Sequence, residues 1–387
     1  MTRRHRWSAR RALALLVAAA PPAAAQSAPQ RAAPPAVRAA DYDFDDSHFH
    51  LTNYVQEGTS VRDYLRIMGT RVGRSTLFGI PLQQTWAYAN SGSYAPTYYL
   101  QSDAPLYYYS FTDAFIAMAY RSLSPEQRAR FDPMITGFNP ADMYAAAHIR
   151  RVLRTFPGVF TGIGEFSIHK EFVSAKIAGE VASLTNPALD SILALAGESG
   201  LVVLIHNDVD MPFAKAGAEP VYLTQMKDLV RRHRNATIIW AHMGLGRIVQ
   251  PVRSSASAPA TERNLNFELV VQGILADPTL GHVSFDISWD EVQKYILATP
   301  ETTRRSADMI NRYPDRFLFG SDVVAPRDSA MYFAVYDAYR PLWTLLTPDA
   351  RVKVSRGNYE RLFDAGRTRV RAWERAQGWV AQGSTDR

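Results

Sequence analysis

The sequence predicts an α/β fold in which eight parallel strands close into a (β/α)8 barrel, a TIM barrel. Three observations lead to this class. Eight short β-rich apolar runs recur from residue 41 onward, helix-like intervals separate them, and the chain lacks the GxGxxG and GxxxxGK[ST] motifs of open nucleotide-binding sheets. A length of 387 residues accommodates one such barrel with room for excursions.

The predicted strands are close to continuous apolar segments, which is typical of parallel strands buried on both faces. In chain order they occupy residues 44–50, 106–112, 133–138, 159–166, 201–206, 237–242, 282–288 and 316–321. Helix-like intervals lie at residues 141–156, 187–199 and 221–233. We therefore expect a single barrel domain over residues 41–387.

Two intervals are irregular. Residues 51–105, rich in Tyr and Trp, separate the first and second predicted strands, and residues 253–263 form a polar loop after the sixth. In a barrel both would follow the carboxyl end of a strand and overhang the mouth, where TIM barrels carry their sites. The aromatic interval either closes over a substrate or packs on itself.

The net charge of +6 is concentrated at the N-terminus. Residues 1–11 carry five Arg and no acid, residues 12–20 are apolar, and an Ala-x-Ala sequence precedes Gln26, which is the pattern of a cleavable signal peptide over residues 1–25. Its removal lowers the net charge from +6 to +1 and argues against nucleic acid as a partner. We expect a periplasmic or secreted protein, with weak twin-arginine character and no membrane span after cleavage.

Residues 26–40 are rich in Ala and Pro and predict a linker between the signal peptide and the domain. The chain has no Cys, which excludes disulfides, thiolate metal sites and a Cys nucleophile.

Polar side chains gather where predicted strands end. The residues are His48 and His50 on the first strand, Glu165 on the fourth, His206 on the fifth, His242 on the sixth and Asp322 after the eighth. Since side chains alternate along a strand, His48 and His50 face the same side. A set of imidazoles and carboxylates without thiolate favours zinc, with manganese or iron as alternatives. If these six residues had only structural roles, each would need its own reason to be buried at the end of a strand.

The order of these residues resembles that of the amidohydrolase superfamily, and the surrounding sequence resembles its amidohydrolase-related branch (amidohydrolase 2). The matching segments are DSHFHL, GIGEF, LIHND, WAHMGLGR, FDISWDE, FGSDV and GNYERLF, which span nearly the whole chain after the linker. The resemblance implies a barrel that binds one or two divalent ions. It places His48, His50 and Asp322 on the first ion, and His206 and His242 on the second.

The resemblance leaves the number of ions open. Glu165 stands where related enzymes use a bridging carboxylate, which favours two ions. In single-metal members the residue matching His206 is a ligand, and the one matching His242 handles a proton or polarises the substrate. Asp322 would accept the proton of the attacking water in hydrolytic members.

The leading functional hypothesis is therefore hydrolysis of an ester, lactone, amide or phosphoester by metal-activated water, with Asp322 as general base. The alternative is non-oxidative decarboxylation, which the same superfamily also performs. A third possibility is a non-catalytic exported binding barrel. The expected partner is a small-molecule substrate, and the sequence leaves the oligomeric state open.

Further residues near the predicted site have two interpretations each. His169 and Lys170 either reach the mouth of the barrel or lie in a solvated loop. Asp286 or Asp290 could orient a ligating histidine from the second coordination shell.

Overall fold

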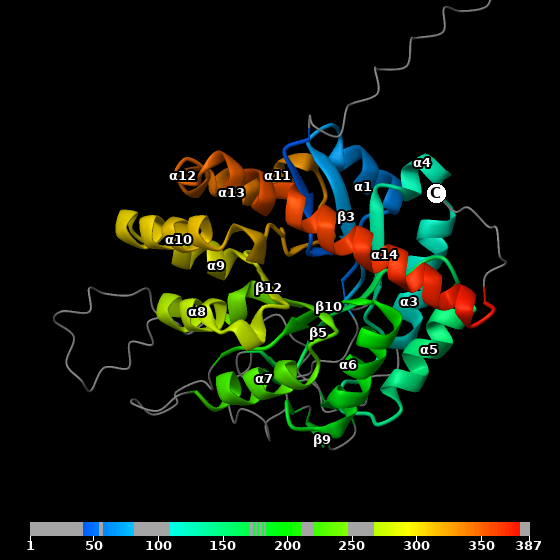
Figure 1. Ribbon diagram of the computed structural model, residues 1–387. Helices are drawn as coiled ribbons and strands as arrows, with labels where there is room; N and C mark the ends of the chain where they lie inside the picture. The colour runs from blue at the N-terminus through cyan, green and yellow to red at the C-terminus, as the bar shows by residue number, and fades with distance from the viewer. Residues whose placement is uncertain are drawn as a thin grey trace, which may run out of the picture. The chain divides into compact units, whose positions relative to one another are not determined.

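The computed structural model describes residues 42–53, 57–80, 109–170, 173–174, 176–177, 180–181, 183–209, 220–246 and 267–379 (Figure 1). The chain divides into two units, residues 1–37 and 38–387, and the fold described here belongs to the second. The expected signal peptide and linker, residues 81–105 of the aromatic interval, and the loop at 253–263 lie outside the described residues. Within those residues no helix has the length and apolar character needed to cross a membrane.

Eight parallel strands form one sheet whose spatial order follows the chain order. They are β1 (Phe44–Asp46), β3 (Val72–Leu77), β4 (Phe131–Ile135), β5 (Gly162–Ser167), β10 (Val202–His206), β11 (Thr237–Trp240), β12 (Val283–Asp286) and β13 (Phe317–Leu318). Every neighbouring pair is parallel. The predicted barrel topology is therefore present.

The first and last strands meet through their extensions, which closes the barrel. Strand β2 (Phe49–His50) pairs in parallel with β14 (Val323–Val324). One step earlier, the Ser47 amide donates to the Phe319 carbonyl oxygen at 3.1 Å. Closure removes the open edges that a sheet of this size would otherwise expose.

Helices follow the strands and pack outside the sheet. The helices are α1 (Val61–Met68), α3 (Tyr109–Arg121), α4 (Pro125–Arg128), α5 (Ala145–Thr155), α6 (Pro187–Ser199), α7 (Val221–Arg232), α8 (Phe267–Ala276), α9 (Asp290–Ile296), α10 (Pro300–Arg312), α11 (Ser329–Ala338), α12 (Arg340–Trp343), α13 (Pro348–Val352) and α14 (Asn358–Ala376). Short hairpins add β6 (His169–Lys170) with β7 (Val173–Ser174), and β8 (Lys176–Ile177) with β9 (Glu180–Val181).

Helix α6 shows how the sequence sets such boundaries. Asn186 caps its N-terminus by accepting from the Ala188 amide, and Pro187 occupies the first turn, where its missing N–H costs nothing. The helix ends at Gly200, whose φ of 85° lies in the left-handed region. These signals explain why the predicted bounds, residues 187–199, match the structure.

The prediction for the second strand was wrong. The second strand is β3, and residues 109–112 belong to helix α3; the first three residues of the predicted strand lie outside the described residues. Strand β3 lies inside the interval 51–105, so only the part of that interval from residue 78 onward follows the second strand. The sequence of β3, VGRSTL, has too little apolar character to predict a buried strand. Arg74 is tolerated within it because its guanidinium donates to the buried carboxylate of Asp132 at 2.7 Å. The Tyr-rich run has high strand propensity but continues into an Ala- and Met-containing helical segment.

The N-terminal half of the barrel interior is filled, which leaves its C-terminal half for chemistry. A buried apolar cluster contributed by β4, β10, β11, β13 and α14 occupies it; its members include Met134, Val202, Leu204, Ile239, Leu318 and Phe363. Helix α14 packs across the beginnings of the strands, where Arg367 donates to the Phe131 carbonyl oxygen at 2.9 Å. Polar side chains collect at the opposite ends of the strands.

Candidate metal centre

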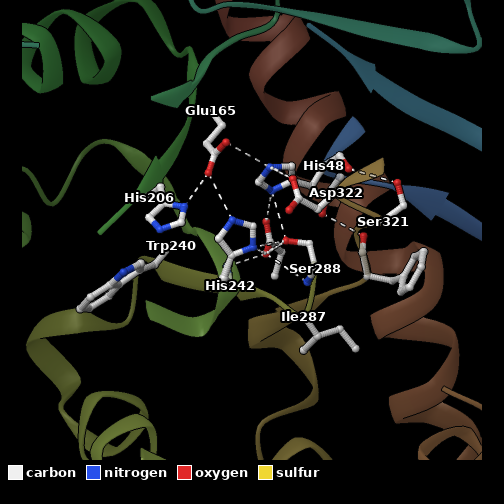
Figure 2. Close-up of polar contacts among 12 residues, drawn as sticks. His48, Glu165, His206, Trp240, His242, Ile287, Ser288, Ser321 and Asp322 are labelled. Carbon is white, nitrogen blue, oxygen red and sulfur yellow. Dashed lines mark hydrogen bonds and ion pairs between the residues drawn. The ribbon is translucent and has the colours of Figure 1, made fainter. Parts of the chain in front are cut away.

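All six residues predicted for the site converge at the carboxyl ends of the strands. Figure 2 labels five of them, all except His50. His48 precedes β2 and His50 ends it, Glu165 lies in β5, His206 ends β10, His242 follows β11 in a 3-10 turn (Ala241–Gly244), and Asp322 precedes β14. The first five are buried, and the Asp322 side chain is 13% exposed. Five separate strand ends thus supply one polar cluster inside an otherwise apolar barrel.

Glu165 stands between two pairs of histidines. Its Oε2 lies 3.5 Å from His48 Nε2 and 3.6 Å from His50 Nε2. Its Oε1 lies 2.7 Å from His206 Nδ1 and 3.2 Å from His242 Nε2. Each oxygen of this carboxylate therefore faces one pair of imidazoles, as a carboxylate shared between two cations would.

Asp322 completes the side formed by the first strand. Its Oδ1 lies 3.3 Å from His48 Nε2 and 3.2 Å from His50 Nε2. Donor atoms of His48, Glu165, His242 and Asp322 all lie within 4.8 Å of one another, close enough to share an ion.

Asp286 and Ser288 determine which nitrogens of two histidines face the centre. Asp286 Oδ2 lies 3.0 Å from His48 Nδ1, and an ionised carboxylate can only accept, so Nδ1 carries a proton and Nε2 is the nitrogen that faces the centre. Ser288 donates its hydroxyl to Asp286 Oδ1 and lies 2.8 Å from His242 Nδ1. The His242 Nδ1–H therefore donates to Ser288, and Nε2 presents its lone pair to Glu165.

His206 contacts a carboxylate at each ring nitrogen: its Nε2 lies 3.1 Å from Asp208 Oδ1, and its Nδ1 lies 2.7 Å from Glu165 Oε1. With Nε2–H donating to Asp208, Nδ1 is the nitrogen available to an ion beside Glu165. Among the described residues, the buried His48 Nε2 has no hydrogen-bond partner, although two carboxylates lie within 3.5 Å. Lone pairs and carboxylates this close need a cation between them, either a proton or a metal ion. The donor set thus fits a divalent metal.

The electrostatics of the cluster favour cations. Burial opposes the charged form of His48, but the carboxylates of Glu165, Asp286 and Asp322 prevail and raise its pKa well above the usual range. Burial likewise opposes ionisation of Asp322, yet the histidines around it hold its pKa well below the usual value. For His242, burial lowers the pKa, so its imidazole is neutral at pH 7 and available as a ligand.

The backbone is strained at two of these residues. His242 has a φ of 56° and Asp322 a φ of 54°, in the left-handed region that non-glycine residues seldom adopt. Gly164, beside Glu165, has a φ of 113°, and a Cβ there would overlap the Leu204 carbonyl oxygen. Unfavourable conformations of this kind persist where the surrounding structure holds functional side chains in place.

The structure resolves the alternatives for the flanking residues. Asp286 supports a histidine, whereas Asp290 is exposed and pairs with Lys294 at 2.7 Å. His169 is buried and stacks on Tyr222 with 3.8 Å between ring centroids. Both residues of strand β6 therefore belong to the surroundings of the site, because the charge of Lys170 also acts on Glu165 and lowers its pKa against the effect of burial.

Sequence reasoning missed Ser288 and Trp289. The Trp289 ring lies 5.1 Å from the His242 ring and 6.0 Å from the His206 ring, and Lys170 Nζ lies 5.6 Å from the Trp289 ring. Ser288 lies two residues after Asp286, so strand alternation carried a signal for it. Trp289, with a φ of 76°, had no such signal.

The family model described as amidohydrolase matches residues 45–365, a segment that contains all six site residues. The chain belongs to this family. It is therefore an enzyme of the metal-dependent amidohydrolase superfamily, as the strand-end motifs indicated. The comparison with curated proteins found no match.

Several solved structures are similar to the chain. A putative 2-pyrone-4,6-dicarboxylic acid hydrolase from Pseudomonas putida is 13% identical with a TM-score of 0.48, and the match covers 84% of this chain and 98% of that one. A 5-carboxyvanillate decarboxylase from Sphingomonas paucimobilis is 13% identical with a TM-score of 0.44, covering 83% and 98%. An uncharacterised TIM-barrel protein from Bordetella bronchiseptica is 13% identical with a TM-score of 0.48, covering 83% and 99%.

Proposed function

We propose that this amidohydrolase hydrolyses a small organic substrate, an ester, lactone, amide or phosphoester, with two divalent ions. The observation that supports this proposal is the position of Glu165, which turns one oxygen to the His48–His50 pair and the other to the His206–His242 pair. Two ions would use both oxygens of a carboxylate that faces both histidine pairs, whereas a single ion would need only one of these oxygens.

In this proposal His48, His50 and Asp322 hold one ion, and His206 and His242 hold the other. Zinc suits the donor set best, with manganese and iron as alternatives. When bound, divalent ions supply a polarised water nucleophile and a Lewis acid for a substrate oxygen.

Asp322 acts as the general base in the proposed reaction. Its side chain is the most exposed of the six, and its Oδ1 lies on the same side as the first pair of histidines. Because its pKa is held low, the carboxylate is ionised at neutral pH. It accepts the proton of the attacking water and returns it to the leaving group.

The experiment combines metal content with turnover. Purified protein is saturated with zinc or manganese, counted by elemental analysis, and assayed against a panel of esters, lactones, amides, phosphoesters and carboxylated ring compounds. We expect about two ions per chain and hydrolysis of at least one class. Glu165→Gln should bind one ion or none and lose turnover by at least about 100-fold, whereas Glu301→Gln, an exposed change on α10, should leave both unchanged.

Two results would contradict the proposal. Saturation of the wild-type protein at one ion per chain would refute the two-ion arrangement. Release of carbon dioxide from a carboxylated compound, without hydrolysis of any member of the panel, would assign the site to decarboxylation.

A further inference from the structure

A polar cavity lies at the opposite end of the barrel from the metal centre. It has a volume of about 440 Å³, within the range of small-molecule sites. Its wall includes Tyr42 and Asp43, which directly precede β1, and Arg71, which directly precedes β3. The other wall comes from α11, α12, α13 and the segment Lys353–Gly357. The residues before the strands mark the N-terminal end, whereas the metal centre occupies the C-terminal end.

Positive charge predominates in this cavity. Four arginines and two aspartates line it; the arginines are Arg71, Arg340, Arg351 and Arg356. Arg71 offsets one of the two acidic charges, because its guanidinium contacts Asp43 at 2.6 Å and both oxygens of Asp337 at 2.6 and 3.1 Å. The charge of Arg340 also acts on Asp337, and the four arginines exceed the two aspartates by two positive charges. Within the described part of the chain, neither Arg340 nor Arg351 forms an ion pair with an acidic side chain.

The floor of the cavity is rigid and partly aromatic. The rings of Tyr336 and Trp343 are buried and stack with 5.2 Å between centroids. Trp343 Nε1 donates to the Tyr336 carbonyl oxygen at 3.1 Å, and the Tyr336 hydroxyl donates to the Asp43 carbonyl oxygen at 3.3 Å. Burial raises the pKa of the Tyr336 hydroxyl, and the positive charge of Arg351 partly offsets this rise, which places Arg351 beside the floor. A floor held in this way costs little entropy to organise around a ligand.

We infer that this cavity binds a small anion with at least two negative charges, carried by phosphate or carboxylate groups. Planar guanidinium groups match the geometry of these oxyanions and bind them with two parallel hydrogen bonds. Arg340 and Arg351 supply such groups, and Arg71 is already committed to the aspartates. The ligand is not the substrate of the metal centre, because the filled half of the barrel interior separates the two sites.

The test uses full-length, metal-loaded protein and equilibrium dialysis with two radiolabelled probes, inorganic phosphate and succinate. We expect one equivalent of at least one probe to bind, and the stronger probe identifies the phosphate or carboxylate source. The double variant R340Q/R351Q should weaken binding at least tenfold. The matched double variant R304Q/R375Q removes the same charge from exposed positions outside the cavity and should change binding less than twofold.

Asp322→Asn separates the two ends of the barrel. If the anion binds in the cavity, this variant keeps the probe while losing metal. The inference is overturned if Asp322→Asn abolishes probe binding and R340Q/R351Q retains it, since the anion would then sit at the metal centre. It is also overturned if neither probe binds at millimolar concentration, or if both double variants bind as the wild type does.

Discussion

Replacing Asp286 with asparagine should weaken metal binding more than any other change outside the six proposed ligands. One oxygen of Asp286 accepts from His48 Nδ1 at 3.0 Å, and the other accepts from the His242 amide at 2.7 Å and from the Ser288 hydroxyl. Asparagine has a similar shape but only one acceptor oxygen, so its amide group must turn a donor towards one of these donors.

Either orientation of the new amide disturbs a ligand. If its NH2 faces His48, the imidazole has to move its proton to Nε2, the nitrogen that faces the carboxylates. If its NH2 faces the other side, the support of His242 through Ser288 is lost. The loss of one such support typically lowers metal affinity by about 10–100-fold, or roughly 1.4–2.7 kcal/mol. We expect about 100-fold for Asp286→Asn and about 10-fold for Ser288→Ala, which affects one histidine directly.

The affinities can be measured by competition with a chromophoric chelator, with denaturant unfolding as a check that each variant is folded. Asp290→Asn is the matched control, because this exposed aspartate pairs only with residues of its own helix in the described structure. Folded Asp286→Asn protein with wild-type metal affinity would refute the reasoning. A larger effect of Ser288→Ala than of Asp286→Asn would refute the proposed hierarchy.

The remaining predictions concern stability. Burial opposes the charge of Asp132, but two arginines and hydrogen bonds hold its pKa at about 2, below the unfolded value of about 3.9. The stabilisation is therefore present above about pH 4 and lost as the pH falls through 2, so Asp132→Asn should flatten the pH dependence of the denaturant midpoint over this window; an unchanged slope would contradict it. Gly164→Ala should destabilise by more than about 1 kcal/mol, whereas Gly273→Ala, in exposed helix with open space around it, should stabilise by about 0.5–1 kcal/mol in the same unfolding assay; the reverse order would refute this.

The sequence was informative where one residue type dominates a local pattern. Apolar runs predicted seven of the eight strands, because strands buried on both faces must be apolar, and the polar residues at their ends predicted the cluster. Strand β3 could not be found in this way. Arg74 lies inside it and is stabilised by Asp132, a partner 58 positions along the chain that only the fold brings near.

The details of the centre also depended on the fold. A sequence can place His48 and Glu165 at the ends of predicted strands, but it does not show which way the two oxygens of Glu165 point. That direction depends on the backbone around the residue. The same holds for Ser288, whose role rests on its 2.8 Å distance from His242 Nδ1. The cavity beside Arg71 had no sequence signal, because its walls come from segments about 270 residues apart.

The seam between β2 and β14 has a consequence for how the domain is assembled and taken apart. His50 and Asp322 lie on either side of this seam, 3.2 Å apart at their donor atoms and 272 positions apart in the chain. An ion bound by both His50 and Asp322 would cross-link the two ends of a very large loop, and such a cross-link restricts an unfolded chain more than one that closes a short loop. During synthesis this cross-link cannot form until nearly the entire barrel has emerged from the ribosome. On removal of metal, we expect the seam to open before the rest of the sheet, so hydrogen exchange at the Asp322 and Ala325 amides, which bond across it, should report the loss first.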